Sequence, residues 1–123
     1  MGGQFRLKRQ ITTTKRQDLK ERLLRERPFC GARKFRPHEC AGGLDMHEAL
    51  YKRNDVPPEL QGYLWDERNC VLICNWSHMQ WGQRHDFNEV MADTLVEWYG
   101  RPAIEDYLFL APFKIKTPLD YLT

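Results

Sequence analysis

Polar side chains that can bind a metal ion or move a proton border two apolar segments in the middle of the chain. His47 and Glu48 lie in the segment LDMHEAL, and Asn69 directly precedes the apolar run CVLIC. His78 follows four residues after that run. Imidazole and carboxylate groups are ligands for divalent cations, and histidine, with an ordinary pKa of about 6.5, is a suitable general base at neutral pH. We therefore expect one divalent ion where these segments meet.

A second set of metal-ligand residues consists of cysteines and one histidine. A structural zinc site takes four nitrogen or sulfur ligands in a tetrahedron. Four such side chains are available in Cys30, His38, Cys40 and Cys74. The alternative is that these cysteines are buried free thiols, because cysteine packs as a small apolar residue. Both interpretations stay open at this point, whereas we assign Cys70, inside the apolar run, to the core.

The order of elements around the first set of residues is strand, loop, strand, helix. We predict strands over residues 44–50 and 70–74 and a helix over residues 77–85, with one helical turn in the loop. An antiparallel hairpin crossed by a helix would bring the polar side chains at these junctions to one spot. Because neighbouring residues of a strand point to opposite faces, only one of the pair His47-Glu48 can face that spot.

Helices flank the predicted hairpin on both sides. Residues 1–14 have no clear period and favour a flexible or extended arm, after which Thr14 caps a helix over residues 15–27. Two further helices are predicted over residues 87–99 and 102–109, the first ended by a glycine. The expected fold class is α+β, a hairpin-plus-helix core with flanking α-helices.

Charge divides the chain into a basic arm and an acidic body. Residues 1–36 carry 12 Lys or Arg and 3 acidic residues, a net charge of +9, whereas residues 37–123 carry −7. Such an arm suits phosphate groups, because release of their counterions drives binding; a solvated tail is the alternative. We place a basic arm and helix at residues 1–28 and the hairpin domain with C-terminal helices at 29–123. The candidate DNA-backbone contacts are Arg6, Lys8, Arg9, Lys15 and Arg16.

Length and composition exclude several classes of protein. The 123 residues, 41% of them hydrophobic, suffice for one small domain, and small domains often need a disulfide or a metal ion for stability. No apolar stretch approaches a membrane span, and no apolar run near the start indicates a signal peptide. We expect an intracellular protein with no membrane partner. Cysteines near histidines in a reducing compartment favour metal ligation over disulfides. The oligomeric state and any protein partner are not readable from the sequence.

The two chemistry-bearing segments resemble the motifs of the HNH endonuclease family, in particular its small phage-associated members. LDMHEAL resembles the first-strand motif, and NCVLICNWSH, from Asn69 to His78, resembles the signature N-x-x-x-L-C-x-x-C-H. The similarity covers about residues 30–85. The resemblance implies a ββα-metal fold and an enzyme that nicks DNA or cuts both strands. It also implies Mg²⁺, Mn²⁺ or Zn²⁺ as cofactor and, for a phage-encoded protein, the host cytoplasm as its location.

The resemblance assigns roles to individual residues. His47 and His78 are the implied metal ligands, and Asn69 helps to bind the ion or orients the base. His85 lies seven residues after His78, which is about two helical turns, so the two imidazoles could share a helix face. His85 is then a further ligand, a phosphate contact or an exposed residue. Many family members also hold a structural zinc between two Cys-x-x-Cys pairs, but here Ser77 stands where the last cysteine is expected.

The general base is the point at which this chain departs from the family, which most often reads His-His or Asp-His on the first strand. Two assignments follow. His47 binds metal and Glu48 is the base, or His47 is the base and Glu48 or Asp45 supplies an acidic ligand. Glutamate, with an ordinary pKa of about 4.3, is a weak base unless it is desolvated. A third interpretation is that activity is lost, which leaves a zinc-stabilised DNA-binding module or an adaptor in a phage complex.

Overall fold

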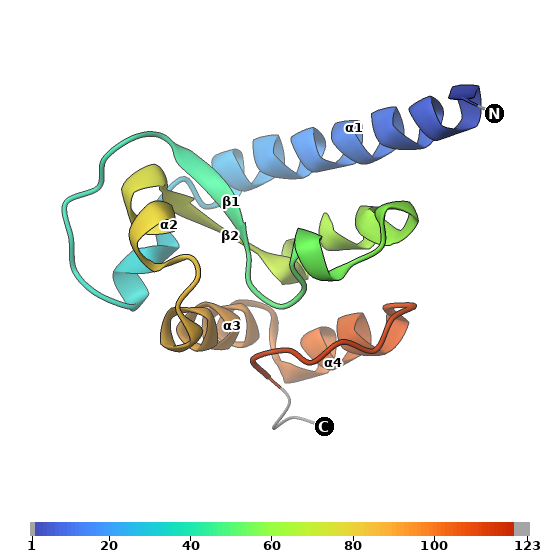
Figure 1. The fold of residues 1–123 in the computed structure, drawn as a ribbon. Helices are drawn as coiled ribbons and strands as arrows, with labels where there is room; N and C mark the ends of the chain where they lie inside the picture. The colour runs from blue at the N-terminus through green and yellow to red at the C-terminus, as the bar shows by residue number, and fades with distance from the viewer. Residues whose placement is uncertain (1, 120–123) are drawn as a thin grey trace.

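The protein has a mixed α+β fold, as predicted, built from one two-stranded antiparallel sheet and helices on both sides of it (Figure 1). The computed structural model describes residues 2–119 and the side chains of residues 14–119. The main elements are α1 (Gly2–Glu26), β1 (Leu44–Glu48), β2 (Cys70–Cys74), α2 (Asn75–Trp81), α3 (His85–Tyr99) and α4 (Arg101–Leu110). Short 3₁₀ segments connect them: η1 (Gly31–Lys34), η2 (Arg53–Asp55), η3 (Pro58–Leu64) and η4 (Glu67–Asn69).

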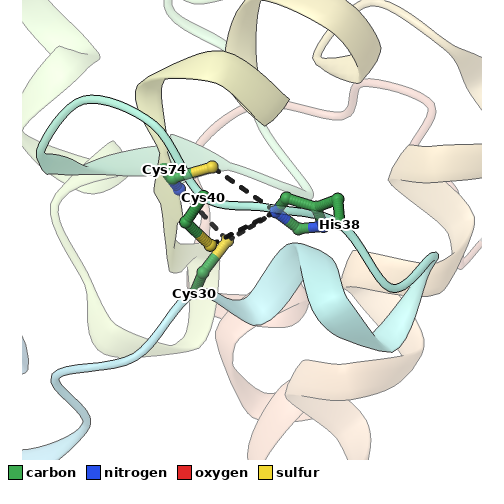
Figure 2. Close-up of side chains that lie close together, drawn as sticks. All are labelled: Cys30, His38, Cys40 and Cys74. Carbon is green, nitrogen blue, oxygen red and sulfur yellow. Dashed lines mark hydrogen bonds between the residues drawn. The ribbon is translucent and has the colours of Figure 1, made fainter.

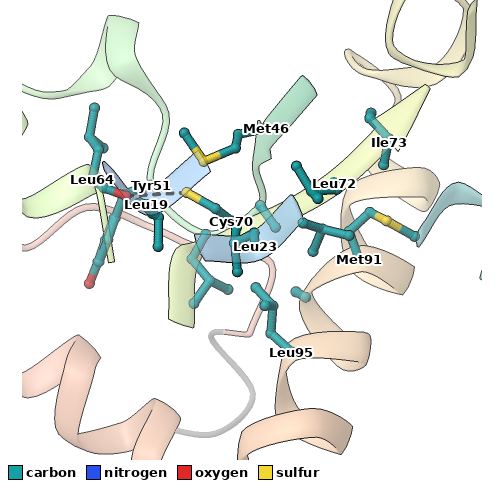
Figure 3. Packing of buried hydrophobic residues seen from close by; sticks show 14 of the residues in the cluster. Leu19, Leu23, Met46, Tyr51, Leu64, Cys70, Leu72, Ile73, Met91 and Leu95 are labelled. Carbon is teal, nitrogen blue, oxygen red and sulfur yellow. Dashed lines mark hydrogen bonds between the residues drawn. The ribbon is translucent and has the colours of Figure 1, made fainter. Parts of the chain in front are cut away.

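Strand β2 is buried on both faces, which explains its uninterrupted apolar sequence. It pairs with β1 over its full length, with His47 opposite Val71 and Glu48 opposite Cys70. Every residue of β2 is buried, including Cys70, as predicted. Figure 3 shows side chains from α1 and from α3 packed around this strand. The hairpin therefore lies between two helices, which fixes the positions of the side chains that leave its ends. The residues that pack against it from the helices are Leu19, Leu23, Met91 and Leu95.

Helix α1 is longer than the sequence pattern predicted. Residues 1–14 were expected to form a flexible or extended arm, but α1 begins at Gly2, so Thr14 lies inside the helix and does not cap it. Gln, Leu, Lys and Arg between residues 4 and 10 are good helix formers, and no proline interrupts them. A helix of 25 residues is about 37 Å long. Its C-terminal half packs on the hairpin, and its N-terminal half extends past it (Figure 1).

The helices after the hairpin also differ from the prediction at one point. The single helix expected over residues 77–85 is two helices, because α2 ends at Trp81 and α3 begins at His85. The backbone at Gly82 lies close to the preceding turn, and a Cβ there would be 2.5 Å from the carbonyl oxygen of His78. Glycine therefore fits this break between the helices. The helices predicted over residues 87–99 and 102–109 are confirmed within two residues, and Gly100 has a φ of 87° at their junction. No helix in the described part of the chain is long and apolar enough to cross a membrane.

Asn69 closes the long loop between the two strands. Its buried side-chain oxygen accepts hydrogen bonds from the amides of Leu50 (3.0 Å) and Tyr51 (2.8 Å). Its side-chain nitrogen donates to the carbonyls of Tyr51 (3.0 Å) and Leu64 (3.1 Å). All four hydrogen-bonding positions of the amide are therefore used to hold both ends of one loop.

Replacing Asn69 with alanine leaves four buried backbone groups without these partners. We expect Asn69→Ala to lower the free energy of unfolding by about 3 kcal/mol, measured by urea denaturation. Asn54→Ala, at an exposed position of the same loop, is the matched control and should change it by less than about 0.5 kcal/mol. Equal stabilities for the two variants would contradict this structural role.

Candidate metal centre

Three cysteine sulfurs surround one nitrogen of His38. His38 Nε2 lies 3.6 Å from Cys30 Sγ, 3.4 Å from Cys40 Sγ and 3.4 Å from Cys74 Sγ. All four ligand atoms lie within 4.8 Å of one another, and Figure 2 shows the side chains converging from three segments. None of the cysteines forms a disulfide. The structure therefore brings together the whole set of four residues that the sequence offered, at a spacing that suits one metal ion. We call this set the Cys₃His cluster.

The spacing fits a tetrahedral ion better than hydrogen bonding. One ring nitrogen has a single hydrogen or a single lone pair, so it cannot form three hydrogen bonds with three sulfurs. Sulfur at about 2.3 Å and nitrogen at about 2.05 Å from a tetrahedral zinc ion lie about 3.6 Å apart. His38 Nδ1–H donates to the Arg36 carbonyl (2.8 Å), which leaves the lone pair on Nε2. A second hydrogen bond of this kind is the usual companion of a metal-bound histidine.

Two close backbone contacts bring the ligands together. The chain at Gly31 approaches β2 so closely that a Cβ there would lie 2.3 Å from a methyl carbon of Val71, and this approach carries Cys30 to the end of the strand. The amide of Cys74 donates to Cys30 Sγ (3.2 Å). On the other side, the amides of Asn75 and Trp76 donate to carbonyls of residues 43 and 41, at 3.0 Å each. The loop that carries His38 and Cys40 is thus held against the start of α2.

The electrostatic surroundings of the cluster differ among its thiols. Burial raises the pKa of Cys30. Burial also acts to raise the pKa of Cys74, but hydrogen bonds with the Ser77 hydroxyl and amide, and weaker ones, outweigh it and lower the pKa to about 6. The guanidinium of Arg33 donates to Cys40 Sγ (3.5 Å). Ser77 therefore contributes a hydroxyl beside Cys74, and His38 is available as the fourth ligand of the cluster.

Away from the Cys₃His cluster, two histidines lie close together, His47 on β1 and His78 on α2. Their ring centroids are 5.4 Å apart at an angle of 84°. His47 is buried, and its Nε2–H donates to Asn88 Oδ1 (2.7 Å), which leaves the lone pair on Nδ1. Burial, followed by the nearby charge of Lys52, lowers the pKa of His47 to about 3. His47 is therefore a neutral imidazole at physiological pH, a form that can bind a metal ion.

No carboxylate from the described side chains joins this histidine pair. Glu48 points elsewhere: its Oε1 accepts a hydrogen bond from the Arg53 amide (3.1 Å) and lies 3.6 Å from Arg53 Nε. Asp45 forms ion pairs with Arg16 (3.2 Å) and Lys20 (3.3 Å). Among the side chains of residues 14–119, the only cluster of three or more ligand residues is the Cys₃His cluster. The described residues therefore do not complete a ligand set for an ion between the two histidines.

Two further candidate ligands lie away from the histidine pair. Asn69 spends its whole amide on the loop between the strands, so the structure gives it a positioning role and not a place beside an ion. His85 does not share a helix face with His78, because a new helix begins at His85. Its Nε2 lies 2.7 Å from Glu89 and its side chain is 83% exposed. The prediction of a single helix over residues 77–85 is wrong, and of the three alternatives for His85 its high exposure agrees with that of an exposed residue.

The candidate DNA contacts lie on α1. Arg6, Lys8 and Arg9 belong to its N-terminal half, outside the residues whose side chains the structure describes. Lys15 is exposed. Arg16 is partly buried, forms the ion pair with Asp45, and has its guanidinium carbon 5.3 Å from the centre of the Trp65 ring. Arg16 therefore serves the packing of α1 on the body of the protein.

Two residues beside His47 were not singled out from the sequence. Asn88 accepts from His47 and from Lys52 Nζ (3.0 Å) through the same oxygen, and its side-chain nitrogen donates to the carbonyls of Gly82 and Arg84. The available signal was its place on the apolar stripe of the helix predicted over residues 87–99, three residues before Met91. Lys52 gave no such signal, since it lies in a loop.

Comparison of the chain with protein-family models, with curated proteins and with solved structures found no match.

A metal ion bound by the Cys₃His cluster should stabilise the protein. A ligand present at a thousand times its dissociation constant adds about 4 kcal/mol to stability, so we expect chelation to lower the unfolding temperature markedly. Elemental analysis of purified protein should find one zinc per chain. Cys30→Ser and Cys74→Ser should lose it, whereas Cys70→Ser, a buried cysteine outside the cluster, should keep it. Full metal content in Cys74→Ser would contradict the ligand set.

The buried neutral imidazole of His47 should make stability depend on pH. As the pH falls below about 6.5, the unfolded state takes up a proton at this residue and the folded state does not until about pH 3. The free energy of unfolding that the neutral His47 contributes above pH 6.5 is therefore lost as the pH falls from 6.5 to 3. His47→Gln can still donate to Asn88 and does not titrate. Urea denaturation at several pH values should show that the free energy of unfolding falls more steeply with decreasing pH for the wild type than for His47→Gln. Parallel pH profiles of the two proteins would contradict a lowered pKa at His47.

Proposed function

We propose that this protein is a DNA-binding module of the HNH type, with a ββα-metal fold stabilised by a zinc ion in the Cys₃His cluster. The observation that carries the proposal is the position of the cluster. Cys74 ends β2 and caps α2, while Cys30, His38 and Cys40 precede β1. An ion there ties the hairpin to the helix that follows it, in the part of the chain that resembles the HNH motifs. Intracellular action on DNA follows from this proposal.

The charge distribution supports DNA as the partner. The first 36 residues carry a net charge of +9 on a chain whose overall net charge is +2. Near the middle of α1 and near its end, Lys15 and Arg25 are exposed and have no carboxylate partner among the described side chains. A basic helix that extends beyond the body can follow a phosphate backbone, with an affinity that falls as salt rises. Phosphate contacts orient a protein on DNA without specifying its sequence.

Metal-dependent cleavage of DNA is the second candidate function, and one observation favours it. His47 and His78 meet at the junction of hairpin and helix, and the hydrogen bond to Asn88 leaves Nδ1 of His47 available. The two histidines provide two ligands, and the carboxylates of Asp45 and Glu48 are engaged with Arg16, Lys20 and Arg53. The binding module therefore has more support from the geometry than the nuclease.

One pair of assays separates the two functions. Zinc-loaded protein should retard a short DNA duplex at 50 mM salt and lose most of this binding at 200 mM. The binding module leaves supercoiled plasmid intact with Mg²⁺ or Mn²⁺, whereas the nuclease converts it to nicked circles or linear DNA. Nicking that disappears in His78→Ala and persists in His85→Ala would establish the second candidate. Absence of DNA binding at low salt would rule out both.

A further inference from the structure

We infer that the phosphate-binding surface includes Arg36, held on the ring of Phe35 beside the histidine pair, and does not consist of helix α1 alone. This inference rests on the proposed function, because it names a second place at which the same DNA backbone is bound. The expected ligand chemistry is a phosphodiester of duplex DNA. We call the surface formed by Arg36, Phe35 and Arg84 the Arg36 surface.

Arg36 combines a guanidinium that forms no ion pair with a contact to an aromatic ring. Six of the arginines with described side chains form ion pairs with a carboxylate: Arg16, Arg22, Arg53, Arg68, Arg84 and Arg101. Arg36 forms none, and its side chain has no hydrogen-bond partner among the described residues. Its guanidinium carbon instead lies 4.9 Å from the centre of the Phe35 ring. Stacking uses the flat face of a guanidinium and leaves its N–H groups, which lie at the edge, free to donate to a phosphate.

Phe35 is a rigid support for that guanidinium. Its ring makes edge contacts with Trp81 (5.3 Å) and Phe87 (5.2 Å), both of which are buried. Phe87 in turn contacts the ring of His47 at 5.3 Å. A side chain held in place before binding loses less entropy when it binds. Two ring contacts, of Phe35 with Phe87 and of Phe87 with His47, therefore connect the ring under the Arg36 guanidinium to the histidine pair.

Arg84 and its partner belong to the same surface. The Arg84 guanidinium carbon lies 5.5 Å from the centre of the Phe35 ring, and its Nε and Nη2 donate to the two oxygens of Asp86 (3.0 and 2.8 Å). The positive charge of Arg36 also helps to lower the pKa of Asp86, after the larger effects of Arg84 and of the hydrogen bond from the Phe87 amide. Arg84 forms the ion pair with this carboxylate, which leaves the positive charge of Arg36 for an external anion.

The location of this surface extends the DNA contact away from the arm. Segment η1 lies beside α2 and α3, at the end of the molecule opposite the N-terminus of α1 (Figure 1). The inference therefore places a second phosphate contact far from the start of α1.

The experiment measures affinity for a 30-base-pair duplex by fluorescence anisotropy over a series of salt concentrations, with the zinc-loaded full chain. For Arg36→Gln we expect several-fold weaker binding at 100 mM salt and a salt dependence, d log K/d log [salt], reduced by about 0.9, the value for one phosphate contact. Arg36→Lys keeps the charge but not the planar stack and should fall between this variant and the wild type. Arg101→Gln, an exposed arginine paired with Glu105 on α4, is the matched control and should bind as the wild type does.

The outcomes separate this inference from the proposed function. If the wild type binds DNA and Arg36→Gln shows the affinity and salt dependence of Arg101→Gln, the Arg36 surface does not contact phosphate and the inference fails, while the DNA-binding module stands. If the wild type does not bind at 50 mM salt, both fail. Metal content and unfolding temperature of Arg36→Gln should equal those of the wild type, since the exposed guanidinium makes no hydrogen bond within the described protein.

Discussion

The convergence of three sulfur atoms on one imidazole nitrogen is the constraint on which the hairpin depends. Three thiols and a histidine would not stay at 3.4–3.6 Å without a reason, because each thiol loses solvation there and gains at most a weak hydrogen bond. A divalent cation bound there would supply that reason, since it binds thiolates directly. It would also close the chain between Cys30 and Cys74, and a small domain gains stability from such a closure.

The cluster also determines the position of side chains that do not touch it. His38 packs edge-on against Trp81 at 5.1 Å, Trp81 contacts Phe87 at 6.1 Å, and Phe87 contacts His47 at 5.3 Å. Because protein interiors are close-packed, a shift of His38 must be taken up along this row of rings. The loop that carries His38 therefore also supports Phe35 and the histidine pair. The Cys₃His cluster and the histidine pair are thus connected by one row of ring contacts.

The sequence predicted most of the hairpin region because its patterns are short-range. Strand β2 has a five-residue apolar run, and the helix ending before Gly100 has both a 3.6-residue period and a stop signal. The four ligands of the Cys₃His cluster were identifiable by residue type. Their convergence was not, because it depends on the close approach of Gly31 to β2 and on backbone hydrogen bonds between residues 41–43 and α2. These contacts join segments more than 30 residues apart.

The failures of prediction have equally specific causes. The break between α2 and α3 was missed because His78 and His85 fit one helical repeat, and the repeat says nothing about the turn at Gly82. The structural role of Asn69 was not predicted, because an amide side chain can bind either a metal ion or backbone groups. Only the four backbone groups around it, from Leu50, Tyr51 and Leu64, decide between the two.

Electrostatics gives the two histidine-containing sites opposite preferences. Three thiolates around a divalent ion carry a net charge of −1, and Arg33 lies beside Cys40 to balance it. Next to His47, the ammonium of Lys52 shares the Oδ1 atom of Asn88 with the imidazole. A cation at that position disfavours a second cation and favours an anion. The Cys₃His cluster is therefore suited to hold a metal ion, whereas Lys52 disfavours one next to His47.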